Sequence, residues 1–211
     1  MNARVMAAVS IGAVLIASCA GGPKPLDWQI EAKGAMERAL AAYLEGNGRV
    51  EQAAMAIVRS RLARTGRADL LANAELAACA ARVASLVFEP CVRFEPLRRD
   101  VPEAQRAYAD YLLGRPAPQD LALLPEPQRA AAHAGSIAQV ADPLSRLVAA
   151  GVLLRAGKAS PEVIGQAIDT ASSQGWRRPL AAWLGVQARR AELAGRTEEA
   201  AALRRRIALT Q

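Results

Sequence analysis

The feature that most constrains the fold is the regular interruption of alanine- and leucine-rich segments by glycine or proline. Within these segments apolar side chains recur at three- and four-residue spacing, which is the period of an α-helix. Glycines close several segments, and Asp142-Pro143 and Ser160-Pro161 have the form of helix starts, with a capping side chain before proline. No stretch shows convincing strand alternation. The sequence therefore predicts an all-α protein.

The same signals predict where the helices lie. The first expected helices cover 28–45, 49–64, 68–88, 102–114 and 128–141. Four more are expected: one begins at Pro143, two run from Pro161 to Gly175 and from Pro179 to Gly195, and the last follows Thr197 as its N-cap. The turns between most of them are short, which favours antiparallel helical hairpins. We expect one all-helical domain over 27–211, with a proline-rich irregular connection near 89–127.

Composition agrees with helices. Of the 211 residues 52% are hydrophobic but only 4% are aromatic, and alanine and leucine dominate over β-branched residues. This length is enough for one sizeable core. The longest apolar run after the N-terminus, 147–154, lies between Arg146 and Arg155 and is too short to span a bilayer, which takes about 20 helical residues.

Part of the chain resembles tetratricopeptide repeats. That repeat places large, small and large residues in its first helix, then a turn glycine, then alanine in its second helix. The matching residues are Leu40, Ala41, Leu44, Gly48, Ala53 and Ile57. A C-terminal copy matches partly, at Ala188, Ala191, Gly195 and Ala200, but Gln187 and Arg204 stand where the repeat keeps apolar residues. The resemblance implies a short solenoid, and a non-repeating helical bundle is the alternative.

The N-terminus has the pattern of an export signal. Arg4 precedes an apolar run of 13 residues, VMAAVSIGAVLIA, which is too short for a membrane span. The run leads into Ile16-Ala17-Ser18-Cys19, which resembles a bacterial lipobox. The resemblance implies that 1–18 is a signal peptide and that Cys19 becomes the lipid-bearing first residue. A plain secretory signal with an incidental cysteine is the alternative.

The lipobox resemblance also implies a location. The residue after the cysteine is Ala20, and an alanine there resembles the pattern of outer-membrane lipoproteins. We therefore expect a protein of the cell envelope that faces the periplasm. Residues 19–26 form the lipidated cysteine and its tether, which reaches about 23 Å when extended. The membrane, through this lipid, is the first expected partner.

Two cysteines remain, Cys79 and Cys91, and in an oxidising compartment they are expected to form a disulfide. The pairing needs a sharp turn, because a helix from Cys79 to Phe88 would carry the chain about 13.5 Å away. Two buried free thiols are an alternative. A zinc site would need further cysteine or histidine ligands, and His133 is the only histidine, so we expect no metal.

The net charge is +7, and arginine is concentrated near the C-terminus. The residues that form a candidate anion-binding face are Arg177, Arg178, Arg189, Arg190, Arg204, Arg205 and Arg206. Such a face near a membrane would meet anionic lipid or lipopolysaccharide phosphates. A plain solvated face is the alternative, and nucleic acid is not an expected partner for an exported chain.

No catalytic pattern is present. His133 and Ser136 are three residues apart and could share a helical face, but no nucleophile elbow or orienting carboxylate accompanies them. Glu198 and Glu199 are at positions expected for acidic side chains in the first turn of a helix, where negative charge is favourable. Trp183 has core spacing, whereas Trp176 beside two arginines is a candidate for headgroup contact or a packed helix end.

These observations predict a lipid-anchored, non-catalytic binding or scaffold protein of the cell envelope, without a cofactor. Its expected partner is an envelope protein or peptide held by surface contact or in a groove. A cell-wall- or lipid-acting enzyme and an anionic-lipid-binding module are the alternatives. A groove lined by polar and aromatic residues would favour the binding protein, and a pocket with converging carboxylates would favour the enzyme.

Overall fold

The structure is a computed structural model that describes residues 26–210. This part of the chain contains α-helices and two 3-10 helices joined by turns, and no strand. The prediction of an all-α protein is confirmed. The predicted signal peptide 1–18, Cys19 and the tether before Leu26 lie outside the described residues.

The first half of the chain builds two long hairpin helices, a central helix and an irregular arm. Its elements are α1 (Asp27–Leu44), α2 (Gly48–Ala63), α3 (Ala68–Ala84), η1 (Glu95–Asp100), α4 (Glu103–Leu112) and η2 (Pro118–Leu123). The second half contains α5 (Glu126–Ala134), α6 (Pro143–Arg155), α7 (Pro161–Ser173), α8 (Arg177–Leu193) and α9 (Thr197–Ala208). The proline-rich stretch near 89–127 holds the predicted helix of 102–114 as α4, and on either side of it the 3-10 helices η1 and η2.

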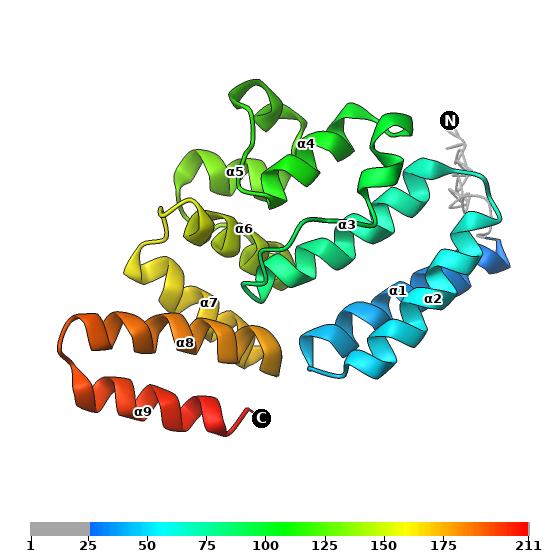
Figure 1. The fold of residues 1–211 in the computed structure, drawn as a ribbon. Coiled ribbons are helices and arrows are strands. Elements are labelled where there is room, and N and C mark those ends of the chain that lie inside the picture. Colours follow the sequence, from blue (N-terminus) through cyan, green and yellow to red (C-terminus); the bar gives the residue numbers. More distant parts are fainter. Residues whose placement is uncertain (1–25, 211) are drawn as a thin grey trace, which may run out of the picture.

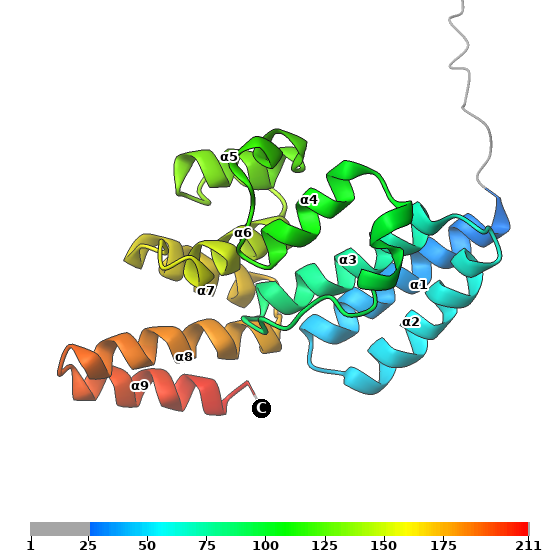
Figure 2. The same ribbon diagram turned by 45° about the horizontal axis from the view of Figure 1, so that its top comes forward.

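Helix α3 lies at the centre of the arrangement (Figure 1). The α1–α2 hairpin packs on one side of it, α4 lies on the other side, and α6 contacts it as well. From α6 the chain continues through α7 to the α8–α9 hairpin, and the start of α8 returns to α1 (Figure 2). The antiparallel hairpins that the short turns predicted are present at both ends of the chain.

The crossing of α3 and α6 is close because a glycine lies in it. Gly151 of α6 is buried, and a side chain there would run into the carbonyl oxygen of Val83 on α3. At the same end of α3, the indole Nε1 of Trp183 on α8 donates to the carbonyl oxygen of Ala84 at 3.0 Å. Trp183 is fully buried, which confirms its predicted place in the core.

Helix α3 ends four residues before the predicted end at Phe88. Ser85 is its C-cap, and Leu86 adopts a left-handed conformation with φ 61°. Leu86 N donates to the Val83 carbonyl and Val87 N to the Arg82 carbonyl, the bonds that close a helix in a Schellman motif. The other described residues with positive φ are glycines, so no glycine marked this end in the sequence.

Three further boundaries differ from the prediction. Helix α5 stops at Ala134 because Gly135 is left-handed, so 136–141 is not helical. Helix α8 begins at Arg177, with Pro179 in its first turn. Thr197 is the first residue of α9 and Arg196 is its cap, which makes no side-chain capping hydrogen bond.

The first hairpin does not pack through all the residues that resemble a tetratricopeptide repeat. Ala41, Ala53 and Ile57 are exposed. Leu44 of the same set is buried, but next to the three exposed residues it is Ala42, Ala54 and Val58 that are buried. The arrangement is therefore best described as a bundle of helical hairpins around α3. No helix among residues 26–210 has the length and apolar character that crossing a membrane requires.

Candidate functional site

A wide hollow lies between α1 and α3. It has a volume of about 400 Å³. Its walls are apolar and come from three helices: Trp28, Ala32, Met36, Val58, Leu62, Leu70, Ala74 and Ala77. Lys33 and Arg67 stand at its edge. Alanines on α1 and α3 create the space, because longer side chains at these positions would fill the angle between the helices.

A second hollow lies on the other flank of α3, toward α4, α5 and α6. Its volume is about 280 Å³. Its apolar lining includes Leu76, Ala80, Leu144 and Val148, and its polar lining is Asn73, Tyr108, Gln128, Asp142 and Ser145. This hollow therefore combines an apolar floor with several groups that can form hydrogen bonds.

The two hollows adjoin each other, since Asn73 and Ala77 line both. These residues are four apart on α3 and so lie on one face of the helix. Here the stripe of α3 that carries Asn73 and Ala77 separates the two flanks. We call the combined surface the α3 groove; it comprises the residues that line the two hollows.

Two polar side chains in the second hollow have no hydrogen-bond partner within the described residues. Gln128 is buried, yet its side-chain amide makes none of the hydrogen bonds of the structure, and neither does the Tyr108 hydroxyl. The Asn73 Oδ1 accepts from Gln105 Nε2 at 2.7 Å, which leaves the Asn73 amide donors for other contacts. Such groups are costly to cover unless a ligand supplies partners.

The phenol of Tyr108 stays protonated at ordinary pH. Burial raises its pKa well above the usual value, and the carboxylate of Asp142 raises it further. Asp142 itself caps α6, where its Oδ2 accepts from Ser145 N at 2.7 Å. The hollow therefore presents a neutral hydroxyl donor beside a carboxylate, which suits hydrogen bonding to uncharged amide groups.

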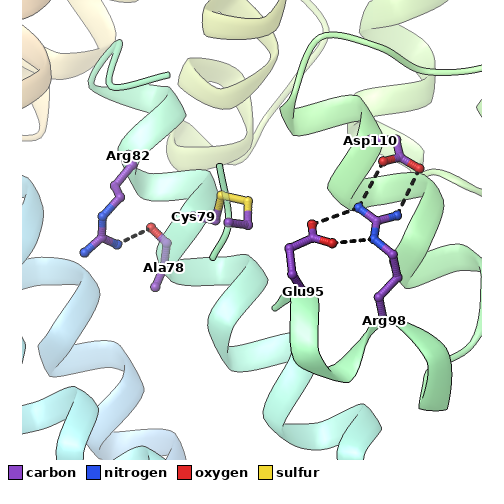
Figure 3. The surroundings of a disulfide bond; sticks show 7 residues. Ala78, Cys79, Arg82, Glu95, Arg98 and Asp110 are labelled. Atoms are coloured by element: carbon purple, nitrogen blue, oxygen red, sulfur yellow. Dashed lines mark hydrogen bonds and ion pairs between the residues drawn. A yellow bond between two sulfur atoms is a disulfide. The ribbon is translucent and has the colours of Figure 1, made fainter. Parts of the chain in front are cut away.

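The predicted pair Cys79 and Cys91 forms a disulfide, with its Cα atoms 5.7 Å apart (Figure 3). The early end of α3 supplies the sharp turn that the pairing needs. Close by, the guanidinium of Arg98 lies between the carboxylates of Glu95 and Asp110, at 2.9 and 3.1 Å. These carboxylates raise the pKa of Arg98, chiefly through the hydrogen bonds that Arg98 donates to Glu95. The disulfide ties the arm 89–100 to α3, and the ion cluster joins η1 to α4.

A smaller hollow of about 220 Å³ borders the disulfide. Two of its basic side chains are paired across α2 and α3, whereas Glu89 and Arg93, which also line it, form no ion pair within the described residues. Arg59 binds Glu75 through two hydrogen bonds, at 2.5 and 3.0 Å, and Arg82 binds Glu51 at 2.8 Å. These ion pairs join the α1–α2 hairpin to α3, so the paired side chains have a structural role.

Arg177 and Arg178, two of the candidate anion-binding residues, contact the end of α1. Arg177 Nε donates to the Glu45 carbonyl at 2.9 Å, and Arg178 Nε donates to the Tyr43 carbonyl at 2.8 Å. Arg178 also lies over the Tyr43 ring, 4.5 Å from its centroid. These arginines complement the carbonyl end of α1, where positive charge is favourable.

The other candidate arginines lie on the α8–α9 hairpin and are exposed. Arg189 and Arg204 both approach Glu192, at 3.7 and 2.5 Å. Arg190, Arg205 and Arg206 form no ion pair within the described residues. The structure thus divides the predicted set between two places, and anion binding by it stays a prediction.

The structure also shows where the other residues singled out in the sequence lie. His133 is exposed on α5, and Ser136 lies beyond the end of that helix, so the two do not share a helical face. Trp176 is the N-cap residue of α8 and packs against the core. Of its two predicted roles, headgroup contact and a packed helix end, the structure shows the packed helix end. Glu198 and Glu199 lie in the first turn of α9 as predicted. Among residues 26–210 no group of three histidine, cysteine or acidic side chains is arranged to hold a metal ion.

Sequence reasoning did not find the α3 groove. Its residues come from six helices, and no local motif joins Trp28, Asn73, Tyr108 and Gln128. The available signal was the polar Asn73 within the alanine-rich run of α3.

Comparison with known proteins does not identify the chain, because no family model, no curated protein and no solved structure matches it.

Proposed function

We propose that the protein is a lipid-anchored, non-catalytic binding protein of the cell envelope, and that the α3 groove holds a segment of an envelope protein. The observation that carries the proposal is the groove itself, in which hydrogen-bonding groups without partners lie between apolar walls. Binding sites in proteins have this character: mostly apolar, with a few polar groups that fix orientation.

The anchor and the groove belong together in this proposal. Cys19 is seven residues before Leu26, so the lipid is at most about 23 Å from the start of α1. The first turns of α1 contribute Trp28 and Lys33 to the groove. The tether therefore keeps the groove near the membrane surface, where segments of other envelope proteins are concentrated.

Cys19→Ser tests the anchor. The variant should remain unlabelled by fatty-acid analogues and uncleaved by the lipoprotein peptidase in the producing cell, because the thiol that receives the lipid is gone. Cys79→Ser is the matched control and should be labelled like the wild type. Labelling of the Cys19→Ser variant would show that the lipobox interpretation is wrong.

Site-specific photocrosslinking in intact cells tests the groove. A photoreactive phenylalanine analogue at Lys33, on the edge of the groove, should give a discrete crosslinked species. The same analogue at Ala53, exposed on α2 and outside every hollow described above, should not. Adding Ala77→Trp, which places a bulky ring on the stripe that borders both hollows, should abolish the Lys33 crosslink while the helical circular dichroism is unchanged.

Equal crosslinking from Lys33 with and without Ala77→Trp would contradict a role of the groove. A crosslink from Ala53 that is stronger than the one from Lys33 would assign the contact to the α1–α2 hairpin instead.

A further inference from the structure

We infer that the partner segment is an extended peptide that crosses α3, with one large apolar side chain in the α1–α3 hollow and its main-chain amides bonded in the second hollow. This inference rests on the proposed function and adds the chemistry of the ligand.

The hydrogen-bonding groups favour an extended segment over a helix. Asn73, Tyr108 and Gln128 offer amide donors and acceptors and a neutral hydroxyl. A helical ligand bonds its own main-chain groups internally and would leave these side chains covered but unpaired. An extended chain has free N–H and C=O groups at every residue, so it supplies the partners that the hollow lacks.

The α1–α3 hollow suits a single large apolar side chain. Trp28, Met36 and Leu70 line it together with alanines. Trp28 and Met36 are only partly buried, so each has apolar surface that a ligand would cover. An aromatic or leucine-like side chain would bury this surface and its own, which is the main source of affinity in such sites.

Charges at the two ends of the groove give the peptide a direction. Lys33 lies at the α1 end, and its contact with Glu37 is long, at 3.9 Å, between two exposed side chains. Arg67 at the same end is held by Asp69. Asp142 at the α6 end has no ion pair within the described residues. Charge complementarity therefore favours a peptide with an acidic residue toward Lys33 and a basic residue toward Asp142.

A peptide display selection on the folded mature protein tests the inference. The probe is a library of random linear nonapeptides, selected on the wild type after depletion on the Ala77→Trp variant. Enriched peptides should contain one large apolar residue flanked by an acidic residue on one side and a basic residue on the other. Proline at positions that a helix would not tolerate should be accepted.

Variants of the polar groups then test the binding mode. Tyr108→Phe and Gln128→Leu should each weaken binding of the best selected peptide by roughly 2–12-fold, the effect of one lost hydrogen bond. Lys33→Gln should weaken peptides with the acidic residue and leave their alanine-substituted versions unchanged. Ala53→Leu, outside the groove, should change neither affinity.

Three results would overturn the inference. One is enrichment of amphipathic helical sequences whose binding is insensitive to Tyr108→Phe and Gln128→Leu. Another is the absence of any peptide that prefers the wild type to Ala77→Trp. The third is palmitate below its micellar concentration saturating the Trp28 fluorescence change while no peptide is enriched, which would assign the hollow to an acyl chain. In the first two cases the crosslink from Lys33 would be retained if the proposed function is right, whereas an acyl chain in the hollow would contradict the proposed function as well, so the failures are distinguishable.

Discussion

At the scale of single residues, Trp183 joins two parts of the bundle that are distant in sequence. Its fully buried ring lies in the core, and its Nε1 donates to the carbonyl of Ala84 at the end of α3. That carbonyl belongs to the last turn of the helix, where no intrahelical donor is available. The indole therefore contributes both apolar burial and a partner for a buried backbone group.

Trp183→Phe should destabilise the folded domain by about 2–4 kcal/mol, because it leaves the Ala84 carbonyl without its donor and opens a small cavity. Urea unfolding followed by circular dichroism measures the change. Trp176→Phe is the control: Trp176 is only partly buried and donates no side-chain hydrogen bond in the structure, so its loss should be smaller. Equal losses would contradict this account of Trp183.

Tyr108 gives the stability a dependence on alkaline pH. Burial, with Asp142, holds its folded-state pKa above the ordinary value of 10.0. The folded protein therefore keeps a proton that the unfolded chain loses, so the contribution is full below pH 10 and is lost as pH rises beyond it. Between pH 9 and about 11.5 the unfolding free energy should fall less steeply in Tyr108→Phe than in the wild type. Parallel curves for the two proteins would show that this phenol does not titrate differently on unfolding.

At the scale of elements, the α3–α6 contact depends on the absence of a side chain at Gly151. Gly151→Ala should destabilise by about 1–3 kcal/mol, because its methyl group meets the backbone carbonyl of Val83 and the helices must move apart. Gly165→Ala on α7 is the matched control, since nothing lies within 4 Å of its new methyl group. It should stabilise by about 0.5–1 kcal/mol. Thermal or urea unfolding of the two variants should therefore give changes of opposite sign.

The disulfide fixes the arm that follows α3. Cys79 and Cys91 are 12 residues apart, and closing a loop of this size stabilises by roughly 3 kcal/mol. The double variant Cys79→Ala/Cys91→Ala should lower the unfolding free energy by about 2–4 kcal/mol, and dithiothreitol should affect the wild type alone. Quantitative alkylation of both cysteines in the unreduced mature protein would contradict the bridge.

Helix boundaries were predictable where the terminating residue is specific to that role. Gly46, Gly66, Gly175 and Gly195 all have positive φ at helix ends that were expected there. The end of α3 was not predictable, because Leu86 takes the left-handed position and a leucine gives no such signal. Tertiary packing and the disulfide hold a conformation that costs an ordinary residue about 1–2 kcal/mol.

At the scale of the whole molecule, the disulfide was predictable and the groove was not. The cysteine pair follows from counting once Cys19 is assigned to lipid. The groove depends on how α1, α4, α5 and α6 are placed around α3, which local patterns do not encode. The arginines show the same limit: Arg177 and Arg178 are neighbours of the end of α1, 132 and 135 residues away in the sequence.

The central claim is that the α3 groove is occupied by another protein in the envelope, and protection of one engineered cysteine tests it most directly. Asn73→Cys places a thiol on the face shared by both hollows, and Ala53→Cys places one on the exposed side of α2. In the purified mature protein both thiols should react with a maleimide at similar rates. In intact cells the account predicts that Asn73→Cys is protected and that Ala53→Cys reacts as before. Equal labelling of Asn73→Cys in cells and in the purified protein would contradict the claim.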